Sequence, residues 1–407
     1  MDDIFYELLN YIESRPVINT HSHHKEDSFF KEFNLDTLLE NSYVDWCGVP
    51  LEKTPQGRTN YLNKVKFNSY FVWLQKSLQA LHNSDEPLSA DNWDTFSSKI
   101  ENAHKDENYH MNILRQKCRY SKILLDAYWQ PGNDNGHPDT FSPVFRINMF
   151  LFGYSPYVKD HNGNNPLSIY NNNKVIQDID EYISFMKEII MRKKQEGCVA
   201  LKSALAYDRD LNFTETTKQK AQRALSCNLD TRTNEDIKAF QDYVFFKICE
   251  IAAELDLPFQ CHTGMGQLKG TNAMLMHEVI EKNPDTKFIL FHCSYPWLDD
   301  VNGLLHLHRN VYPDLCWLPI ISTSAAQRML YELIEVGTSD KVCWGCDTWT
   351  SEESYGALLA VMYVLADVLG SKVKAGYFSL NDARIVADNI LYNNAANLYK
   401  LSPLCRQ

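Results

Sequence analysis

The sequence predicts an α/β fold, a (β/α)8 TIM barrel with a helical insertion after its first strand. Three observations lead to this prediction. Short apolar runs of strand length recur along the 407 residues, longer amphipathic stretches separate them, and polar residues end several of the runs. Barrels with insertions reach this size as single domains, and we therefore expect one domain over residues 1–407.

Eight apolar runs are short enough to be buried strands of a parallel sheet. They are PVINT (16–20), KILLDAY (122–128), VFRINMFLF (144–152), CVALKSAL (198–205), PFQCHT (258–263), KFILFHCS (287–294), NVYPDLCW (310–317) and KVCWGCD (341–347).

The stretches between these runs predict helices and loops. Residues 236–256 have apolar side chains at helical spacing and predict an amphipathic helix that leads into the fifth strand. Residues 25–120 are too long for one crossover and contain further helical patterns, so they predict a helical insertion. The Asn-rich stretch 162–174 predicts a surface loop.

Composition excludes several classes of protein. Hydrophobic residues make up 44% and charged residues 23%, which is typical of a globular chain. The formal net charge of −12 opposes nucleic-acid binding, which needs clustered Lys and Arg. We find neither an apolar stretch of about 18 residues nor a secretory signal pattern. We therefore expect a soluble, cytoplasmic protein with a small-molecule substrate, no nucleic acid and no membrane partner; a homo-oligomer is compatible with the sequence.

The cysteines predict buried thiols rather than disulfides. Their number, 11, is odd, the chain is large, and several lie inside apolar runs.

Polar residues at the strand ends predict a metal site. Strand one ends in His21-Ser22-His23, and because side chains alternate along a strand, both imidazoles project to one side, within reach of one ion. Barrel enzymes place their chemistry at the C-terminal ends of the strands. His24 lacks this spacing and is expected at the rim or surface. Further polar residues on other strands are Lys202 in strand four, His262 in five, His292 in six and Asp347 in eight.

This pattern, HxH on strand one, Lys on four, His on five and six and Asp on eight, resembles the amidohydrolase superfamily of metal-dependent barrel hydrolases. Longer stretches are similar to the amidohydrolase-type barrel of nodulin-like proteins, where it is joined to a glutamine-synthetase-like domain. The resemblance is strong over residues 198–402 and 15–24. The superfamily usually has Asp where this chain has Asn19, a position expected behind the ligands. The similar stretches are ALKSALAYDRDL, PFQCHTGMG, FILFHCSYPW, KVCWGCDTWTSEESYGALLAVMYVL and DNILYNNAANLYKL.

The resemblance and the residue types imply one or two divalent metal ions. Zinc is the first choice, and manganese, iron or nickel would accept the same ligands. A bound ion lowers the pKa of its water toward about 7, and Asp347 is expected both to ligate the metal and to move a proton. The implied metal ligands are His21, His23, Lys202, His262, His292 and Asp347.

Two arrangements of the centre stay open at this point. In superfamily barrels with two metals, a strand-four lysine is carboxylated and bridges the ions; Lys202 would then do so, with His262 and His292 completing the second site. With one metal, Lys202 is an ammonium that faces the substrate or Asp347, His262 is a third ligand, and His292 contacts the substrate. In either case Asp347, His292 and Lys202 are candidate catalytic residues.

Other residues are candidate substrate contacts. Tyr207 and Arg209 follow strand four, and an arginine there could form a bidentate pair with a substrate carboxylate, although an exposed salt bridge is an equal alternative. Trp349 could wall the pocket. Arg146 lies within an apolar run and needs a partner.

The function predicted from these residues is metal-dependent hydrolysis. A metal-bound hydroxide would attack an amide, ester or lactone-like bond of a small polar substrate that carries a carboxylate. Three alternatives remain: a metal-dependent decarboxylase, a uronate-isomerase-like enzyme, and a non-catalytic binding or scaffold barrel.

Overall fold

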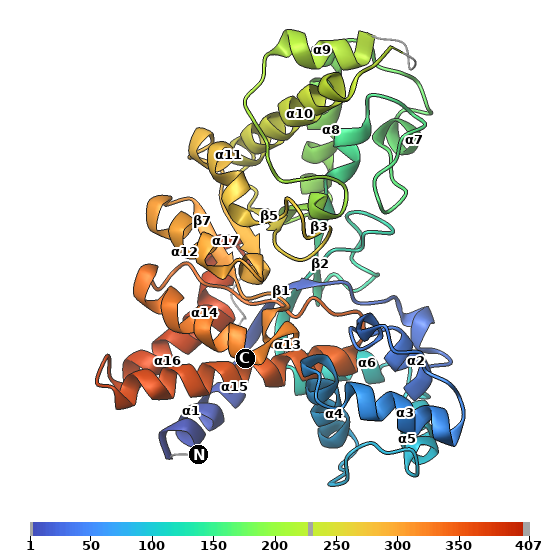
Figure 1. The fold of residues 1–407 in the computed structure, drawn as a ribbon, viewed down its shortest axis with the longest axis vertical. Coiled ribbons are helices and arrows are strands. Elements are labelled where there is room, and N and C mark those ends of the chain that lie inside the picture. The colour runs from blue at the N-terminus through green and yellow to red at the C-terminus, as the bar shows by residue number, and fades with distance from the viewer. Residues whose placement is uncertain (1–2, 227–230, 402–407) are drawn as a thin grey trace.

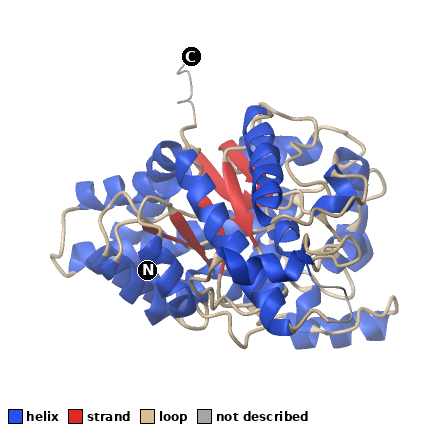
Figure 2. Ribbon diagram, turned by 90° about the horizontal axis from the view of Figure 1, so that it is seen from above, coloured by secondary structure: helices blue, strands red, loops and turns tan. Residues whose placement is uncertain are grey.

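The computed structural model describes residues 3–226 and 231–401. Seven parallel strands form one curled sheet in which each strand pairs with the next along the chain, as βα units require. Figures 1 and 2 show the strands in the middle of the molecule with helices around them. This arrangement is that of a TIM-like barrel. The strands are β1 (Val17–Ser22), β2 (Tyr120–Leu125), β3 (Phe141–Arg146), β4 (Ala200–Ser203), β5 (Phe259–His262), β6 (Phe288–Phe291) and β7 (Val311–Asp314).

The eighth predicted run, residues 341–347, is not a regular strand but bonds to both edges of the sheet. Cys343 forms an isolated parallel bridge with Asp314 of β7. At the other side, the backbone N–H of Asp347 donates to the carbonyl of His21 in β1, at 2.9 Å. The segment therefore connects the first and last strands through backbone hydrogen bonds.

Several strands end earlier than their apolar runs. The run at 198–205 contains only the four-residue β4, and β3 ends at Arg146, after which residues 148–152 form a 3-10 helix. Most of the residues that directly follow β3 and β4 are as buried as the strands themselves. The apolar sequence pattern therefore continues past the point where the hydrogen bonds between strands end.

The chain between β1 and β2 is mostly helical, as its sequence pattern predicts. Its residues form an apolar cluster of their own, which includes Phe33, Trp93 and Ile100. It is also tied to the rest of the fold, since Ser77 donates a hydrogen bond to the carbonyl of Glu352 at 2.6 Å. The helices of this segment are α2 (Leu35–Glu40), α3 (Pro55–Val65), α4 (Ser69–Leu81), α5 (Trp93–Ala103) and α6 (Tyr109–Asn112).

Helices also precede β1 and follow each strand from β3 to β7, whereas β2 and β3 are joined by a loop without a helix. The helix predicted over 236–256 is observed as α10, with Thr233 as its N-cap in a capping box with Asp236. The predicted loop at 162–174 is in part wrong, because Asn165 caps a short helix inside it. These helices are α1 (Asp3–Glu13), α7 (Pro166–Tyr170), α8 (Ile179–Gln195), α9 (Lys218–Ser226), α10 (Asn234–Glu254), α11 (His277–Lys282), α12 (Leu298–Leu307), α13 (Leu318–Ile321), α14 (Thr323–Val336), α15 (Ser351–Lys374), α16 (Leu380–Asp388) and α17 (Asn394–Leu398).

Helix α15 corrects one expectation from the sequence. It is long and apolar enough to cross a membrane by length and composition, although no such stretch was expected. However, 72% of its most apolar window is buried inside the fold, where it packs against α1, α4 and α14. Burial of this kind is typical of a core helix of the fold.

The described cysteines are free thiols, as expected, and all of them except Cys47 are buried. Cys343 and Cys346 have CxxC spacing but different surroundings. Cys343 packs in an apolar cluster with Ile18, whereas the Cys346 thiol contacts the side chains of Asn19 and Thr348.

The contact between α4 and α15 depends on a glycine. A Cβ added at Gly356 would lie 2.8 Å from the backbone oxygen of Trp73 in α4. Because that backbone cannot move aside alone, Gly356→Ala is expected to lower the free energy of unfolding by about 1–3 kcal/mol, measured by urea denaturation. Gly370 in the same helix is the control, since its added Cβ would meet nothing closer than 3.7 Å. Gly370→Ala should raise stability by about 0.5–1 kcal/mol. Equal effects of the two substitutions would contradict this account.

Candidate metal centre

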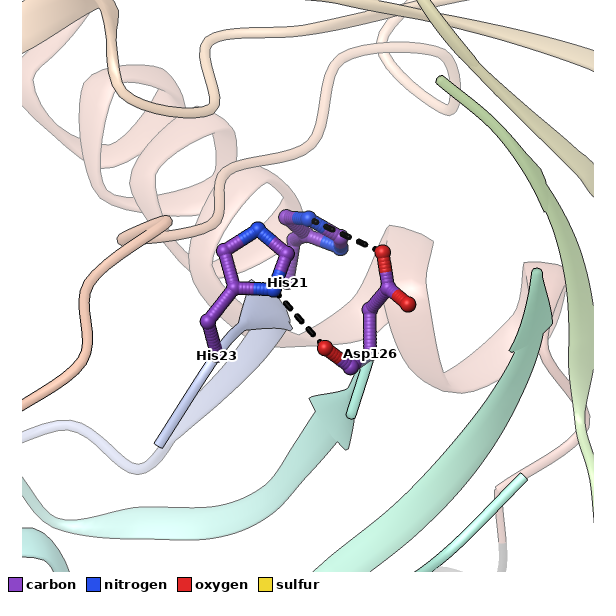
Figure 3. Close-up of side chains that lie close together, drawn as sticks. All are labelled: His21, His23 and Asp126. Atoms are coloured by element: carbon purple, nitrogen blue, oxygen red, sulfur yellow. Dashed lines mark hydrogen bonds and ion pairs between the residues drawn. The ribbon is translucent and has the colours of Figure 1, made fainter. Parts of the chain in front are cut away.

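Two histidines of the first strand converge on one carboxylate. His21 lies in β1 and His23 follows its last residue; both are buried, and their ring centroids are 4.7 Å apart. Figure 3 shows both rings on the same side of the strand, facing Asp126. The Oδ1 atom of Asp347 lies 3.4 Å from Nε2 of His21 and 3.1 Å from Nε2 of His23. The HxH spacing therefore places two imidazoles beside Asp347.

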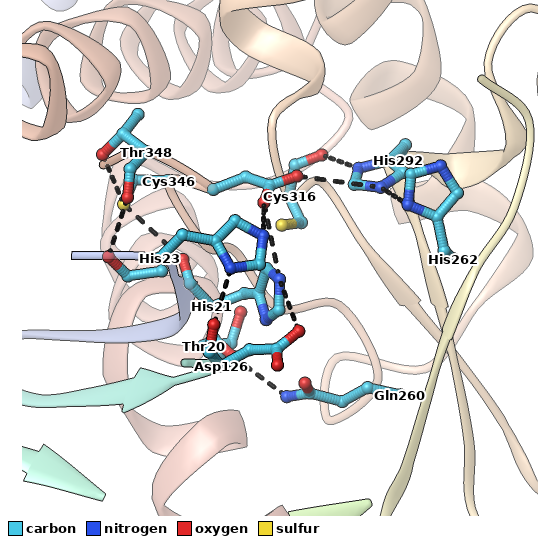
Figure 4. Close-up of polar contacts among 12 residues, drawn as sticks. Thr20, His21, His23, Asp126, Gln260, His262, His292, Cys316, Cys346 and Thr348 are labelled. Carbon is cyan, nitrogen blue, oxygen red and sulfur yellow. Dashed lines mark hydrogen bonds and ion pairs between the residues drawn. The ribbon is translucent and has the colours of Figure 1, made fainter. Parts of the chain in front are cut away.

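A second pair of histidines lies on the other side of the same carboxylate. His262 is the last residue of β5, and His292 follows β6. Nε2 of His292 lies 3.0 Å from Nδ1 of His262 and 3.8 Å from Oδ2 of Asp347. Asp347 thus presents Oδ1 to the first pair of imidazoles and Oδ2 to His292, whose ring lies beside that of His262 in Figure 4.

Backbone carbonyls determine which ring nitrogens can bind a cation. A carbonyl oxygen only accepts hydrogen bonds, so the ring nitrogen facing it must carry the proton and the other nitrogen of a neutral ring has a lone pair. Imidazoles that ligate metals are commonly held in this way. The three pairs are His23 Nδ1 with Asp126 O (2.8 Å), His262 Nε2 with Met265 O, and His292 Nδ1 with Cys316 O (2.9 Å).

The lone pairs of His262 and His292 face each other. Burial lowers the pKa of His292 to about 4 and that of His262 well below its ordinary value, so both rings are neutral at pH 7. Their facing nitrogens, 3.0 Å apart, therefore have no proton between them. On the other side of the site, Nε2 of His23 lies 3.1 Å from Oδ1 of Asp347. Two facing lone pairs repel each other unless a cation lies nearby, and the set of nitrogen and oxygen donors fits a divalent metal ion.

His21 supports the same conclusion. Neither of its ring nitrogens has a hydrogen-bond partner among the described residues, although the side chain is buried. Burial, together with the positive charge of Lys202, holds its pKa well below the ordinary value. A buried imidazole without partners is unfavourable unless it binds a ligand.

Asp347 is ionised in this surrounding. Burial alone would raise the pKa of its carboxyl, but the neighbouring His23, His292 and Lys202 hold it below the ordinary value. The backbone of Asp347 has a φ of 62°, and that of His292 has 61°. Left-handed φ values of this kind are costly for residues with side chains and cluster at functional sites. They turn both side chains into the space between β1 and β6.

Asp126 and Arg146 form a buried ion pair beside the histidines. The guanidinium Nε of Arg146 lies 3.2 Å from Oδ1 of Asp126, and its Nη1 donates to Asn162 at 2.7 Å. Burial raises the pKa of Asp126, but Arg146, His23 and Lys202 together outweigh it, and the net pKa is below the ordinary value. Asp126 is therefore the partner that the buried charge of Arg146 needs.

Lys202 lies at the bottom of the site. It is buried in β4, and its Nζ lies 3.8 Å from the centroid of the Phe291 ring. Burial lowers its pKa to about 8, against the attraction of Asp347 and Asp126. A neutral amine is therefore accessible near neutral pH.

The histidines open into a cavity of about 620 Å³, mouth included. Of the predicted substrate contacts, Tyr207, Trp349 and Arg146 line it. Arg209 does not, because its guanidinium is bound by Asp242 at 2.9 Å. The expectation for His24 is wrong: it is buried, stacks on Phe30, and lies 3.0 Å from a ring nitrogen of His110, because the chain after β1 turns under the helices.

The sequence analysis missed several lining and neighbouring residues. Asp126 directly follows β2, and the rule applied to the other strand ends would have identified it. Tyr43 and Trp46 come from the helical segment after β1 and have no spacing signal that relates them to the barrel. The remaining missed residues of the cavity wall are Tyr128, His161, Asn162 and Ala204.

Fold and side chains together define a candidate metal-binding barrel. Residues 220–401 match a family model described as Amidohydrolase, which confirms the resemblance to amidohydrolase barrels. The chain is 26% identical over 223 residues to Protein fluG of Emericella nidulans; the aligned region is 50% of this chain and 26% of that relative, about a quarter of its length.

Solved structures share this fold across nearly the whole chain. A uronate isomerase of Thermotoga maritima has a TM-score of 0.77 at 14% identity, with 98% of each chain covered. A glucuronate isomerase of Caulobacter crescentus has a TM-score of 0.75 at 14% identity, with 98% of this chain and 94% of that one covered. A Lactobacillus casei protein assigned to the metal-dependent hydrolases has a TM-score of 0.66 at 17% identity, with 97% of each covered. At these identities the likeness shows the fold.

The first prediction for this centre concerns its metal. Replacing both His21 and His23 with Ala removes two lone-pair donors, and the variant should lose at least one metal equivalent in elemental analysis after zinc reconstitution. A His277→Ala, His308→Ala double variant is the control, because these two rings also adjoin, at 5.0 Å, away from the cavity. It should keep its metal. Equal zinc content in both double variants would exclude the first strand as a ligand source.

The second prediction concerns the buried ion pair. Arg146→Met leaves the Asp126 carboxylate without its counter-charge and should lower the free energy of unfolding by about 3–5 kcal/mol, measured by chemical denaturation. The Asp126→Asn, Arg146→Met double variant removes both charges and should recover most of that loss. If it were no more stable than the single variant, the charge of Asp126 would not be the cause.

Proposed function

We propose that this protein is a metal-dependent hydrolase that cleaves an amide, ester or lactone-like bond in a small polar substrate bearing a carboxylate. The observation that carries the proposal is the convergence of His21, His23 and His292 on the two oxygens of Asp347, with His262 lying 3.0 Å from His292. When bound there, a divalent cation, with zinc as first choice, would polarise a substrate carbonyl and lower the pKa of water.

Asp347, His292 and Arg146 have separate roles around the cation position. Asp347 is the ionised group beside the cation position, and we assign to it the transfer of the water proton to the leaving group. His292 presents a neutral Nε2 next to Asp347 and can accept a hydrogen bond from the substrate or water. The guanidinium of Arg146 is already bound by Asp126. Arg146 therefore forms part of the cavity wall and has few N–H groups left to donate to a substrate.

The substrate class follows from the lining of the cavity. Lys202 is a cationic side chain of the cavity, the charge of Arg146 is offset by Asp126, and Tyr43, Trp46 and Trp349 are aromatic. This combination favours a small anionic molecule that stacks a flat or apolar face against the rings. Lys202 keeps two roles: an ammonium that meets the substrate carboxylate, or a carboxylated side chain that bridges two ions.

A second candidate is uronate-isomerase-like proton transfer between sugar carbons. The alignment with uronate isomerases over almost the full length, helical segment included, supports it. Incubation with glucuronate separates the two functions, because an isomerase converts this aldehyde acid to a keto acid without consuming water. A panel of carboxylate-bearing lactones, esters and amides tests the hydrolase.

We also infer the arrangement of the chain around this site. Residues 341–347 act as the eighth, ring-closing segment of a (β/α)8 barrel, and residues 25–120 are an insertion in a single domain. The hydrogen bonds from Cys343 and Asp347 to opposite edges of the sheet support the first inference, and the separate apolar cluster of the helical segment supports the second.

The test of the proposed function is the Asp347→Asn variant. It keeps the shape but loses the proton acceptor, and turnover of the best panel substrate should fall by about two to four decades. Asp340→Asn, at an exposed position immediately before residues 341–347, should retain wild-type turnover. Unchanged turnover in Asp347→Asn would remove the proposed role, provided that metal content is measured in the same samples.

A further inference from the structure

A cysteine thiol lies among the groups at the back of the metal centre. Cys316 follows β7, and its Sγ, a ring nitrogen of His292 and a carboxylate oxygen of Asp347 all lie within 4.8 Å of one another. All three side chains are at most 4% exposed. Figure 4 shows Cys316 between His292 and the first pair of histidines.

The thiol of Cys316 differs from the other thiols at the strand ends. The thiols of Cys261 and Cys293 donate to backbone carbonyls, and that of Cys346 contacts three polar side chains. In the described part of the chain, the Cys316 thiol has no hydrogen bond, although its backbone carbonyl accepts one from His292. Cys316 therefore orients His292 and leaves its own sulfur directed at the same space.

We propose that Cys316 is a thiolate ligand of a second cation position, formed with His292 and Asp347. The inference rests on the proposed metal dependence and adds a ligand and a metal preference to it. Asp347 would serve both positions, with Oδ1 toward His21 and His23 and Oδ2 toward His292. The nitrogen, oxygen and sulfur of this position match the ligand types that zinc accepts in proteins.

Binding of a cation at this position replaces the S–H bond of Cys316 with a bond between sulfur and the cation. The S–H bond of Cys316 breaks, a bond forms between Sγ and the cation, and the proton is released to the buffer. No change of oxidation state occurs. Because sulfur is a soft ligand, the second position selects zinc or cobalt over magnesium or manganese.

Cobalt substitution tests the proposal without a substrate. The full-length protein, freed of metal and loaded with Co²⁺, should show a near-ultraviolet band from thiolate-to-cobalt charge transfer, together with the visible bands of the ion. Cys316→Ser should lose the near-ultraviolet band and bind one equivalent less of Co²⁺. Cys343→Ala is the matched control, since Cys343 is an equally buried barrel thiol in the inner apolar cluster, and it should keep the band.

The outcomes separate this inference from the proposed function. Visible cobalt bands without the near-ultraviolet band in the wild type, or a band that persists in Cys316→Ser, would overturn the role of Cys316 and leave the metal centre intact. A wild-type protein that binds no cobalt at all would overturn the proposed function as well. Circular dichroism of each metal-free variant establishes that it is folded, and Cys316→Ala, which introduces no hydroxyl, repeats the test if the serine variant is not.

Discussion

The hydrogen bonds from imidazole N–H groups to backbone carbonyls are the interaction on which this site depends. They fix the orientation of His23, His262 and His292 and place a proton on the ring nitrogen that faces each carbonyl. Burial holds the pKa of His262 and of His292 well below the ordinary value, so these two rings are neutral and no proton lies between their facing nitrogens. The fold therefore maintains facing lone pairs in a buried site, an arrangement that a bound cation would stabilise.

The backbone around Asp347 makes this arrangement possible. Its segment bonds to both edges of the sheet, and Gly345 lets it pass close to β1, since a Cβ there would lie 2.7 Å from the backbone nitrogen of His21. A hydrogen bond also connects the helical segment after β1 to the chain that follows Asp347. Glu353, six residues after Asp347, accepts it from the backbone N–H of Tyr43 at 2.6 Å. The helices that wall the cavity are thus connected to the helix that begins just after Asp347.

Much of the site was predictable because parallel strands bring their carboxyl ends to one rim. That rule, applied to His21, His23, His262, His292 and Asp347, requires only the order of the strands. It failed where a residue's place depends on the path of the chain between strands. Arg209 follows β4 as closely as Tyr207 does, yet the loop turns it toward α10 and Asp242, outside the cavity.

By itself, the sequence determined the alternation of strands and helices and the ligand types at the rim, because apolar periodicity and strand order are local properties of the chain. Tertiary structure alone decided how these groups act together. It placed the oxygens of Asp347 between two pairs of imidazoles, gave Arg146 its partner in Asp126, buried His24, and brought the sulfur of Cys316 to within 4.8 Å of its neighbours. These outcomes depend on tautomers, backbone dihedral angles and contacts between separate segments of the chain, for which one-dimensional spacing contains no signal.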